Sequence, residues 1–185
     1  MRRDLRLEDN PIFHEIVQKE NTTYTYLLPL YVFAAEQIEV SGFISKGSGK
    51  KSPYPEARSA VGGFWRCGSH RAKFLAESVW DLKETLEGAR SGLEIRVGML
   101  GEVIDKMLEG FAVEKDKGVS IGGVWMANEE GGEEKKEERD VKIACEKAGV
   151  EFKLFTDEKY FIDEYVIPMS ATSRGALRGF HQISL

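Results

Sequence analysis

A chain of 185 residues, 42% hydrophobic and 31% charged, is long enough to bury one core and fits a single domain. Its formal net charge of −5 disfavours a globally basic nucleic-acid binder. The sequence contains no apolar run near the roughly 18 residues that a membrane helix needs, which excludes a membrane-spanning protein. The N-terminus lacks the apolar stretch of a secretory signal, and two cysteines are too few for a disulfide framework. We therefore expect an intracellular protein, in a compartment that the sequence does not distinguish.

The first half of the chain predicts a helix, a strand and a second helix, with a long loop before the last of these. Asn10 and Pro11 are typical of a helix start. The aromatic and β-branched run 24–33 predicts a buried strand, although Pro29 argues against an unbroken one. Residues 41–70 are rich in Gly, Ser and Lys and predict a loop. Residues 71–88 have helical periodicity and predict a helix that ends at Gly88.

The second half continues the alternation of strands and helices. The patterns predict strands at 93–97, 119–126 and 150–155, and helices at about 101–109 and at 133–148. This order predicts an α/β architecture with a mostly parallel sheet. Residues 169–185 have neither a helical nor a strand period, and we expect a disordered tail there.

Most chemistry-bearing residues in the sequence form no recognisable catalytic or metal-binding pattern. The segment 47–52 resembles a phosphate-binding loop only superficially, because no strand leads into it. His14, His70 and His181 are scattered, so no metal site is predicted. Cys145 is expected in the core, and Cys67 lies beside Arg66 without a base in view. We therefore predict no catalytic residue.

Two charged clusters remain as candidates for a functional role. The first is the segment 2–10, which is consistent with a salt-bridged loop that caps a helix, with Leu5 and Leu7 anchored in the core. The second is the acidic segment 126–140, which starts where a predicted strand ends. Ligands of α/β sheets bind at such ends, and carboxylates there can accept hydrogen bonds from the amidine-like N–H groups of a pterin or flavin. The alternative is a solvated acidic helix start, favoured by the helix dipole and by i,i+4 pairs with Lys and Arg.

These two clusters, in this order, resemble a known family. The segment Arg3-Asp4-Leu5-Arg6-Leu7-x-Asp9-Asn10-Pro11 resembles the N-terminal motif of the photolyase/cryptochrome family. Three further segments, 28–33, 71–82 and 128–153, resemble its second strand, its next helix and the stretch after its fourth strand. The resemblance covers residues 2 to about 168. The residues at 63–66 and 128–130 are most similar to those of the DASH-type cryptochromes.

The resemblance implies a Rossmann-like α/β/α domain that binds a light-harvesting antenna chromophore, either 5,10-methenyltetrahydrofolate or a deazaflavin. In this family the antenna passes excitation energy to FAD in a larger helical domain. There, electron transfer repairs pyrimidine dimers in DNA, or the protein acts as a blue-light photoreceptor. The damaged bases are flipped out of the DNA stack to reach the FAD.

The resemblance also suggests which residues serve these roles. The family's antenna site uses a carboxylate after the fourth strand, which corresponds here to Glu129 or Glu130, with Glu134 and Glu137 as further candidates. Arg71 occupies the position of an arginine that lines the deazaflavin version of the pocket. A structural role is expected for the first motif, whose polar members are Arg3, Asp4, Arg6, Asp9 and Asn10.

Three departures from the family pattern shape the prediction. The family's first, central strand is absent before the Arg-Asp-Leu-Arg motif, which would leave neighbouring strands with unpaired edges. The segment 34–37 lacks the Asp-Pro-Arg that the family often has there. No helical FAD domain follows, so we interpret residues 1–168 as a partial antenna domain and 169–185 as a divergent tail. The chain itself is then expected to be non-catalytic, with DNA a partner only of the missing part.

Two other functions remain open at this point. The chain could be a non-enzymatic interaction module that pairs through an exposed sheet edge. It could also be a nucleotide-binding domain of the universal-stress type, although it lacks a glycine-rich phosphate loop.

Overall fold

The computed structural model describes residues 4–18, 24–39, 49–113 and 118–156. Within these ranges helices and strands alternate as α1 (Pro11–Gln18), β1 (Leu30–Ala34), α2 (Ser69–Gly88), β2 (Glu94–Gly98), α3 (Leu100–Val113), β3 (Gly123–Ala127), α4 (Gly132–Ala148) and β4 (Glu151–Phe155). This order confirms the predicted α/β class. The predicted tail, 169–185, lies outside the described residues.

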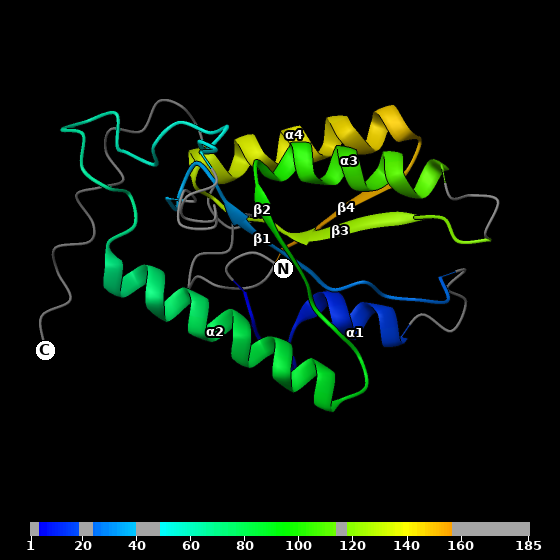
Figure 1. The fold of residues 1–185 in the computed structure, drawn as a ribbon. Coiled ribbons are helices and arrows are strands. Elements are labelled where there is room, and N and C mark those ends of the chain that lie inside the picture. Colours follow the sequence, from blue (N-terminus) through cyan, green and yellow to red (C-terminus); the bar gives the residue numbers. More distant parts are fainter. Residues whose placement is uncertain (1–3, 19–23, 40–48, 114–117, 157–185) are drawn as a thin grey trace, which may run out of the picture.

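The strands form a layer between two layers of helices. Figure 1 shows α3 and α4 side by side over one face of the strands, with α1 and α2 on the other face. β1 pairs in parallel with β2, with Leu30 opposite Glu94. β3 pairs in parallel with β4, with Gly123 opposite Glu151. The architecture is therefore the predicted α/β/α sandwich with parallel strands.

The strand layer is divided between β1 and β3. The described strands form two separate two-stranded sheets, β1–β2 and β3–β4, and no described strand joins them. The helices span the break, because Leu30 of β1 packs against the cluster that α3, α4 and β3 form.

The predicted strand 24–33 is shorter than expected, because the observed strand begins only at Leu30. Pro29 has no N–H to donate to a ladder, so it marks the strand's start, and its carbonyl still accepts a bond from the Glu94 N–H at 2.9 Å. Tyr26 is exposed, and Leu28 is half exposed. The prediction of a buried strand over 24–29 is therefore wrong.

The first hydrophobic cluster lies between the β1–β2 sheet and α2. Odd-numbered side chains of the two strands meet the apolar face of α2 there, as the period of two in strands and 3.6 in helices requires. The buried members are Tyr31, Phe33, Val79, Leu82, Leu86 and Leu93, with Leu5 and Leu7 packed against them. The expectation that Leu5 and Leu7 anchor the N-terminal segment in the core is thus met.

The second cluster lies between α3, α4 and the β3–β4 sheet. Val141 and Cys145 of α4 are fully buried in it, which confirms the predicted core position of Cys145. Burial raises the pKa of the Cys145 thiol to about 11. Gly101 lets the two helices approach closely, since a Cβ atom there would lie 2.7 Å from the Asp140 Cβ. Gly149 ends α4 in the left-handed conformation at φ 68°, as predicted for this C-cap.

Candidate functional site

The candidate site lies at the carboxyl ends of β1 and β3. Both strands end at the same edge of the strand layer, and the N-terminal ends of α2 and α4 lie there too (Figure 1). Parallel strands place their following loops together in this way, which is why ligands of α/β proteins bind at such edges. The acidic segment after β3 and the first turn of α2, which carries Arg71, are therefore neighbours of this edge.

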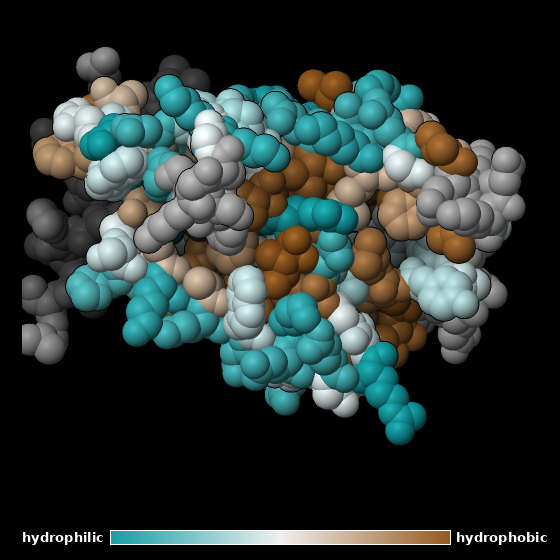
Figure 2. Space-filling model, in the orientation of Figure 1, coloured by the Kyte–Doolittle hydropathy of each residue, from teal (hydrophilic) through white to brown (hydrophobic). Residues whose placement is uncertain are grey.

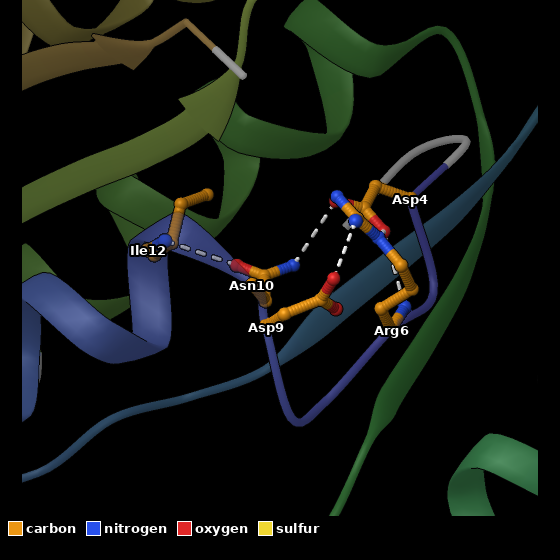
Figure 3. Close-up of polar contacts among 5 residues, drawn as sticks. All are labelled: Asp4, Arg6, Asp9, Asn10 and Ile12. Atoms are coloured by element: carbon orange, nitrogen blue, oxygen red, sulfur yellow. Dashed lines mark hydrogen bonds and ion pairs between the residues drawn. The ribbon is translucent and has the colours of Figure 1, made fainter. Parts of the chain in front are cut away.

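The N-terminal motif forms a compact polar loop around the buried carboxylate of Asp4, as Figure 3 shows. Asp4 accepts hydrogen bonds from the Arg6 backbone N–H at 3.1 Å and from Arg6 Nε and Nη2 at 2.8 and 2.9 Å. It also accepts a long bond, 3.5 Å, from the Asn10 amide. The same guanidinium donates to Asp9 at 2.9 Å. Asn10 in turn accepts the Ile12 N–H at 3.0 Å, which caps α1.

This loop therefore holds residues 4–10 against the start of α1. Arg3, the remaining residue of the motif, lies outside the described residues. In the described part of the motif the polar side chains form hydrogen bonds with one another, which is consistent with a structural role.

The short connection 128–131 between β3 and α4 carries the first two predicted ligand residues. Glu129 is buried, and its N–H donates to Glu138 Oε1 at 2.9 Å. Glu130 is half exposed; its carboxylate accepts from the Asn128 amide at 3.2 Å and lies 3.4 Å from Lys135 Nζ. The ammonium of Lys135 also donates to Asn128 Oδ1 at 2.6 Å. Glu130 is thus the acidic group of this connection that a ligand can reach from solvent.

The first two turns of α4 bury three carboxylates. Glu134, Glu137 and Glu138 are all less than 10% exposed, although glutamate is rarely buried unless it is paired. Glu134 folds back toward the helix N-terminus, where the dipole favours negative charge, and its Oε2 would lie 1.9 Å from a Cβ at Gly131. The spacing i, i+3, i+4 places these side chains on one face of α4. The predicted alternative, a solvated acidic helix start, does not describe these three residues.

One buried tyrosine lies near candidate residues of both α2 and α4. Tyr31 of β1 is 5% exposed. Burial raises its pKa to about 12; nearby Cys67 and Glu137 add to the rise and the Arg71 guanidinium opposes it. Arg71 of α2 and Glu137 of α4, both predicted site residues, therefore lie within electrostatic range of one phenol. Arg71 itself is exposed at the surface.

Two ion pairs tie the surrounding loops to α4. Arg66, in the loop before α2, donates to Glu133 at 2.5 Å. Lys136 donates to Glu36, just after β1, at 2.7 Å, and this contact raises the pKa of Lys136. Glu36 belongs to the segment that departs from the family's Asp-Pro-Arg. In this chain the segment contacts α4 through Glu36.

The structure places Glu129, Glu130, Glu134 and Glu137 in and just after the connection that follows β3, and it places Arg71 in the first turn of α2, which begins at the same edge. Two residues near them were not predicted. Tyr31 was noted only as part of a strand, and Glu138 only as part of an acidic run. The signal that could have identified Glu138 is its helical spacing from Glu134, four residues earlier on the same face.

Other candidates from the sequence are His14, a metal site and a phosphate-binding loop. His14 is exposed on α1. Searching the residues that the structure describes for metal sites finds no group of three or more His, Cys, Asp or Glu side chains able to hold an ion. In the same ranges, no helix is both long and apolar enough to cross a bilayer. The phosphate-loop look-alike, 47–52, lies partly outside the described residues.

Comparison with known proteins places the chain in a family. The DNA photolyase family model matches residues 1–166. A Neurospora crassa protein named as a mitochondrial cryptochrome DASH is 52% identical over 165 residues, which cover 89% of this chain and 22% of that protein. A Gibberella zeae cryptochrome DASH is 45% identical, covering 89% and 23%. The chain thus spans about a quarter of the length of these relatives.

A solved structure shares the fold. It is a crystal structure of an archaeal photolyase from Sulfolobus tokodaii, described as holding two FAD molecules and as implying a novel light-harvesting cofactor. The TM-score is 0.59 at 15% identity, and the match covers 91% of this chain and 32% of that chain. The family model and the cryptochrome DASH relatives establish that the chain belongs to the DNA photolyase family, in which it corresponds to the N-terminal α/β domain.

Proposed function

We propose that this chain is a light-harvesting domain that binds an antenna chromophore at the carboxyl ends of β1 and β3. The observation that carries the proposal is that Glu129, Glu130, Glu134 and Glu137 lie in and just after the connection at this edge, where α2 also begins, with Arg71 in its first turn. Carboxylate oxygens suit the amino and ring N–H groups of a reduced folate or a deazaflavin, because each can accept a charge-assisted hydrogen bond. A guanidinium suits the carboxylates or phosphates on the tail of such a molecule.

The exposed members of the set would meet the ligand first. Glu130 and Arg71 are open to solvent, whereas Glu129, Glu134 and Glu137 are buried behind them. We therefore assign direct contacts to Glu130 and Arg71. The buried carboxylates would hold the connection 128–131 in place, as the bond from Glu129 N–H to Glu138 does.

Chemistry beyond light capture would belong to the remainder of a longer protein. The chain accounts for about a quarter of the length of its cryptochrome DASH relatives. In this family FAD and the DNA-facing pocket lie in the helical part, so we expect no light-driven repair of pyrimidine dimers by residues 1–185 alone. Repair of a dimer by the purified chain with FAD under blue light would contradict this expectation.

Reconstitution tests the proposal directly. The chain is incubated with 5,10-methenyltetrahydrofolate, and in parallel with a deazaflavin, and each mixture is separated by gel filtration. We expect near-ultraviolet absorption to elute with the protein for one of the two. Replacing Glu130 by Gln should weaken binding about tenfold or more, as expected for the loss of a charge-assisted bond.

A matched control separates the site from general effects of charge. Glu146→Gln removes one exposed carboxylate from the far end of the same helix, where it pairs only weakly with Lys142 at 3.8 Å. This variant should bind as the unmodified chain does. Absence of binding of both chromophores by a folded chain at tens of micromolar would refute the proposal, as would an equal loss in E130Q and E146Q.

A further inference from the structure

Among the described strands, β2 pairs with a neighbour on one side only. Glu94 donates its N–H to the Pro29 carbonyl at 2.9 Å, and the Gly98 carbonyl accepts the Ala35 N–H at 3.1 Å, so the even-numbered residues of β2 bond to β1. In a parallel ladder the alternate residues then turn their N–H and C=O groups to the other side. These are Ile95 and Val97, and no described strand pairs with β2 on that side.

A hollow in the surface adjoins β2. A hollow of about 510 Å³ lies between β2 and α3, with Arg96, Val97, Val103, Met107 and Phe111 among its lining residues. Figure 2, which has the orientation of Figure 1, shows hydrophobic surface reaching the exterior between α3 and the strands on this face. Apolar surface beside unpaired main-chain groups is the usual setting for strand addition.

The sequence of the edge is complementary to itself. In Leu93-Glu94-Ile95-Arg96-Val97, an acidic and a basic residue flank Ile95, with one apolar residue beyond each. If a second strand of the same sequence runs antiparallel with Ile95 opposite Ile95, Glu94 of each copy faces Arg96 of the other. Leu93 of each copy then faces Val97 of the other. Opposite charges directly across an antiparallel pair stabilise it, and like charges destabilise it.

From this pattern we propose that two copies of the chain pair through their β2 edges, antiparallel, with Ile95 on the twofold axis. Main-chain bonds would join Ile95 to Ile95 and Leu93 to Val97 across the axis. The interface would be isologous and closed, because the same strand serves both copies. The proposal does not depend on chromophore binding, since the carboxyl-end site is formed by other elements.

Side chains on both faces of the paired strands would make contacts in the dimer. On the α2 face, Ile95 and Val97 already pack against the first hydrophobic cluster, and the second copy would extend it. On the α3 face, Arg96 now pairs with Glu94 of its own strand at 2.7 Å. Pairing would turn two such ion pairs into a four-charge network across the axis.

The ends of the edge are compatible with this register. The loop residue Tyr54 lies against Gly98, where a Cβ would come 2.7 Å from its hydroxyl. The residue of the second copy facing Gly98 is Gly92, which has no side chain and open space around it. Shifting the pairing so that Arg96 faces Arg96 would place like charges together, which disfavours the neighbouring register.

Sedimentation velocity over about 1 to 500 µM tests the proposal, since transient dimers dissociate in this range. We expect dimers whose population rises with concentration. Ile95→Pro removes the outward N–H without touching the β1–β2 bonds, and an edge strand tolerates proline there. Pairing should be lost in I95P and only weakened in the control Ile95→Ala, which keeps the N–H. Circular dichroism verifies that both variants fold.

Charge reversal tests the register. E94R and R96E each place like charges across the axis, so each should dimerise about tenfold or more weakly. Mixing the two variants should restore dimers, because a strand that is acidic at both positions then faces a strand that is basic at both. The double variant E94R/R96E should also dimerise. Lys142→Glu on α4 is the control and should change nothing. Failure of the mixture to associate would overturn the proposal.

Amide hydrogen exchange distinguishes a second copy from a segment of the same chain. Protection of the Ile95 and Val97 amides should increase with protein concentration. Protection of these amides in the monomer, independent of concentration, would show that another part of the chain covers the edge and would overturn the proposal. A chain that remains monomeric throughout the range would do so as well.

Discussion

Asp4 offers the sharpest test of how the N-terminal motif stabilises the fold. Replacing it by Asn keeps the shape of the side chain but removes the charge that three donors of Arg6 and the Asn10 amide share. The carboxylate is 6% exposed, so water replaces these bonds poorly. Hydrogen bonds to charged groups contribute about 1.5–3 kcal/mol each when buried. The Arg6 side chain is 46% exposed, which screens its share. We expect a net loss of about 2–3 kcal/mol for the variant.

Urea unfolding followed by circular dichroism at pH 7 measures this loss as a shift in the midpoint at unchanged m-value. Asp9→Asn is the matched control. Asp9 accepts one bond from the same guanidinium at 2.9 Å but is 69% exposed, so its replacement should cost less than about 0.5 kcal/mol. A double-mutant cycle with Arg6→Met isolates the Asp4–Arg6 coupling. Equal destabilisation by D4N and D9N would refute the argument that burial makes Asp4 the important partner.

Two further predictions concern α3 and the buried ionisable groups. Gly101→Ala should destabilise the fold by about 1–3 kcal/mol, because the new Cβ would press on Asp140 of α4. Gly110→Ala should stabilise it by up to about 1 kcal/mol through helix propensity, because a Cβ there would have no atom within 4 Å. The melting temperatures of the two variants should therefore shift in opposite directions. Stability should fall with rising pH above about 9. The unfolded chain then releases the Cys145 proton that the folded chain keeps until about pH 11, at up to about 1.4 kcal/mol per pH unit. Cys145→Ser has a hydroxyl that does not titrate there. If this variant lost the same stability between pH 9 and 10, below the range in which the raised pKa of Tyr31 acts, another group would be responsible.

The helices were predictable because local patterns determine them. The apolar positions of α2 recur at helical spacing, and α4 ends at Gly149, which adopts the left-handed conformation that glycine favours. The start of β1 was not predictable from hydrophobicity alone. Residues 24–28 have the composition of a strand, but the Tyr24 ring lies against Gly122 and packs edge-on to Trp125, 5.8 Å between centroids. This tertiary contact, together with Pro29, prevents them from extending the ladder.

The position of the candidate residues in the fold was predictable, but which of them are buried and which are exposed was not. The rule that ligands lie at the carboxyl ends of parallel strands pointed to the segment after β3, and the resemblance selected Glu129 and Glu130. Neither source indicated that Glu130 is exposed while Glu129 is buried, because both follow the strand directly. Burial there depends on α4, whose Glu138 receives the Glu129 N–H. Tyr31 escaped notice because a tyrosine within a strand is ordinarily a core residue.

The division of the strand layer has a consequence for this site. Tyr31 and Arg71 belong to the half built on β1 and β2, whereas Glu129, Glu130 and Glu137 belong to the half built on β3 and β4. Since no described strand joins the halves, their relative position depends on the helices and on the ion pairs Arg66–Glu133 and Lys136–Glu36. Both pairs are partly exposed, so salt screens them. A chromophore that contacts both halves should therefore bind less tightly at high ionic strength, even where its own contacts are uncharged.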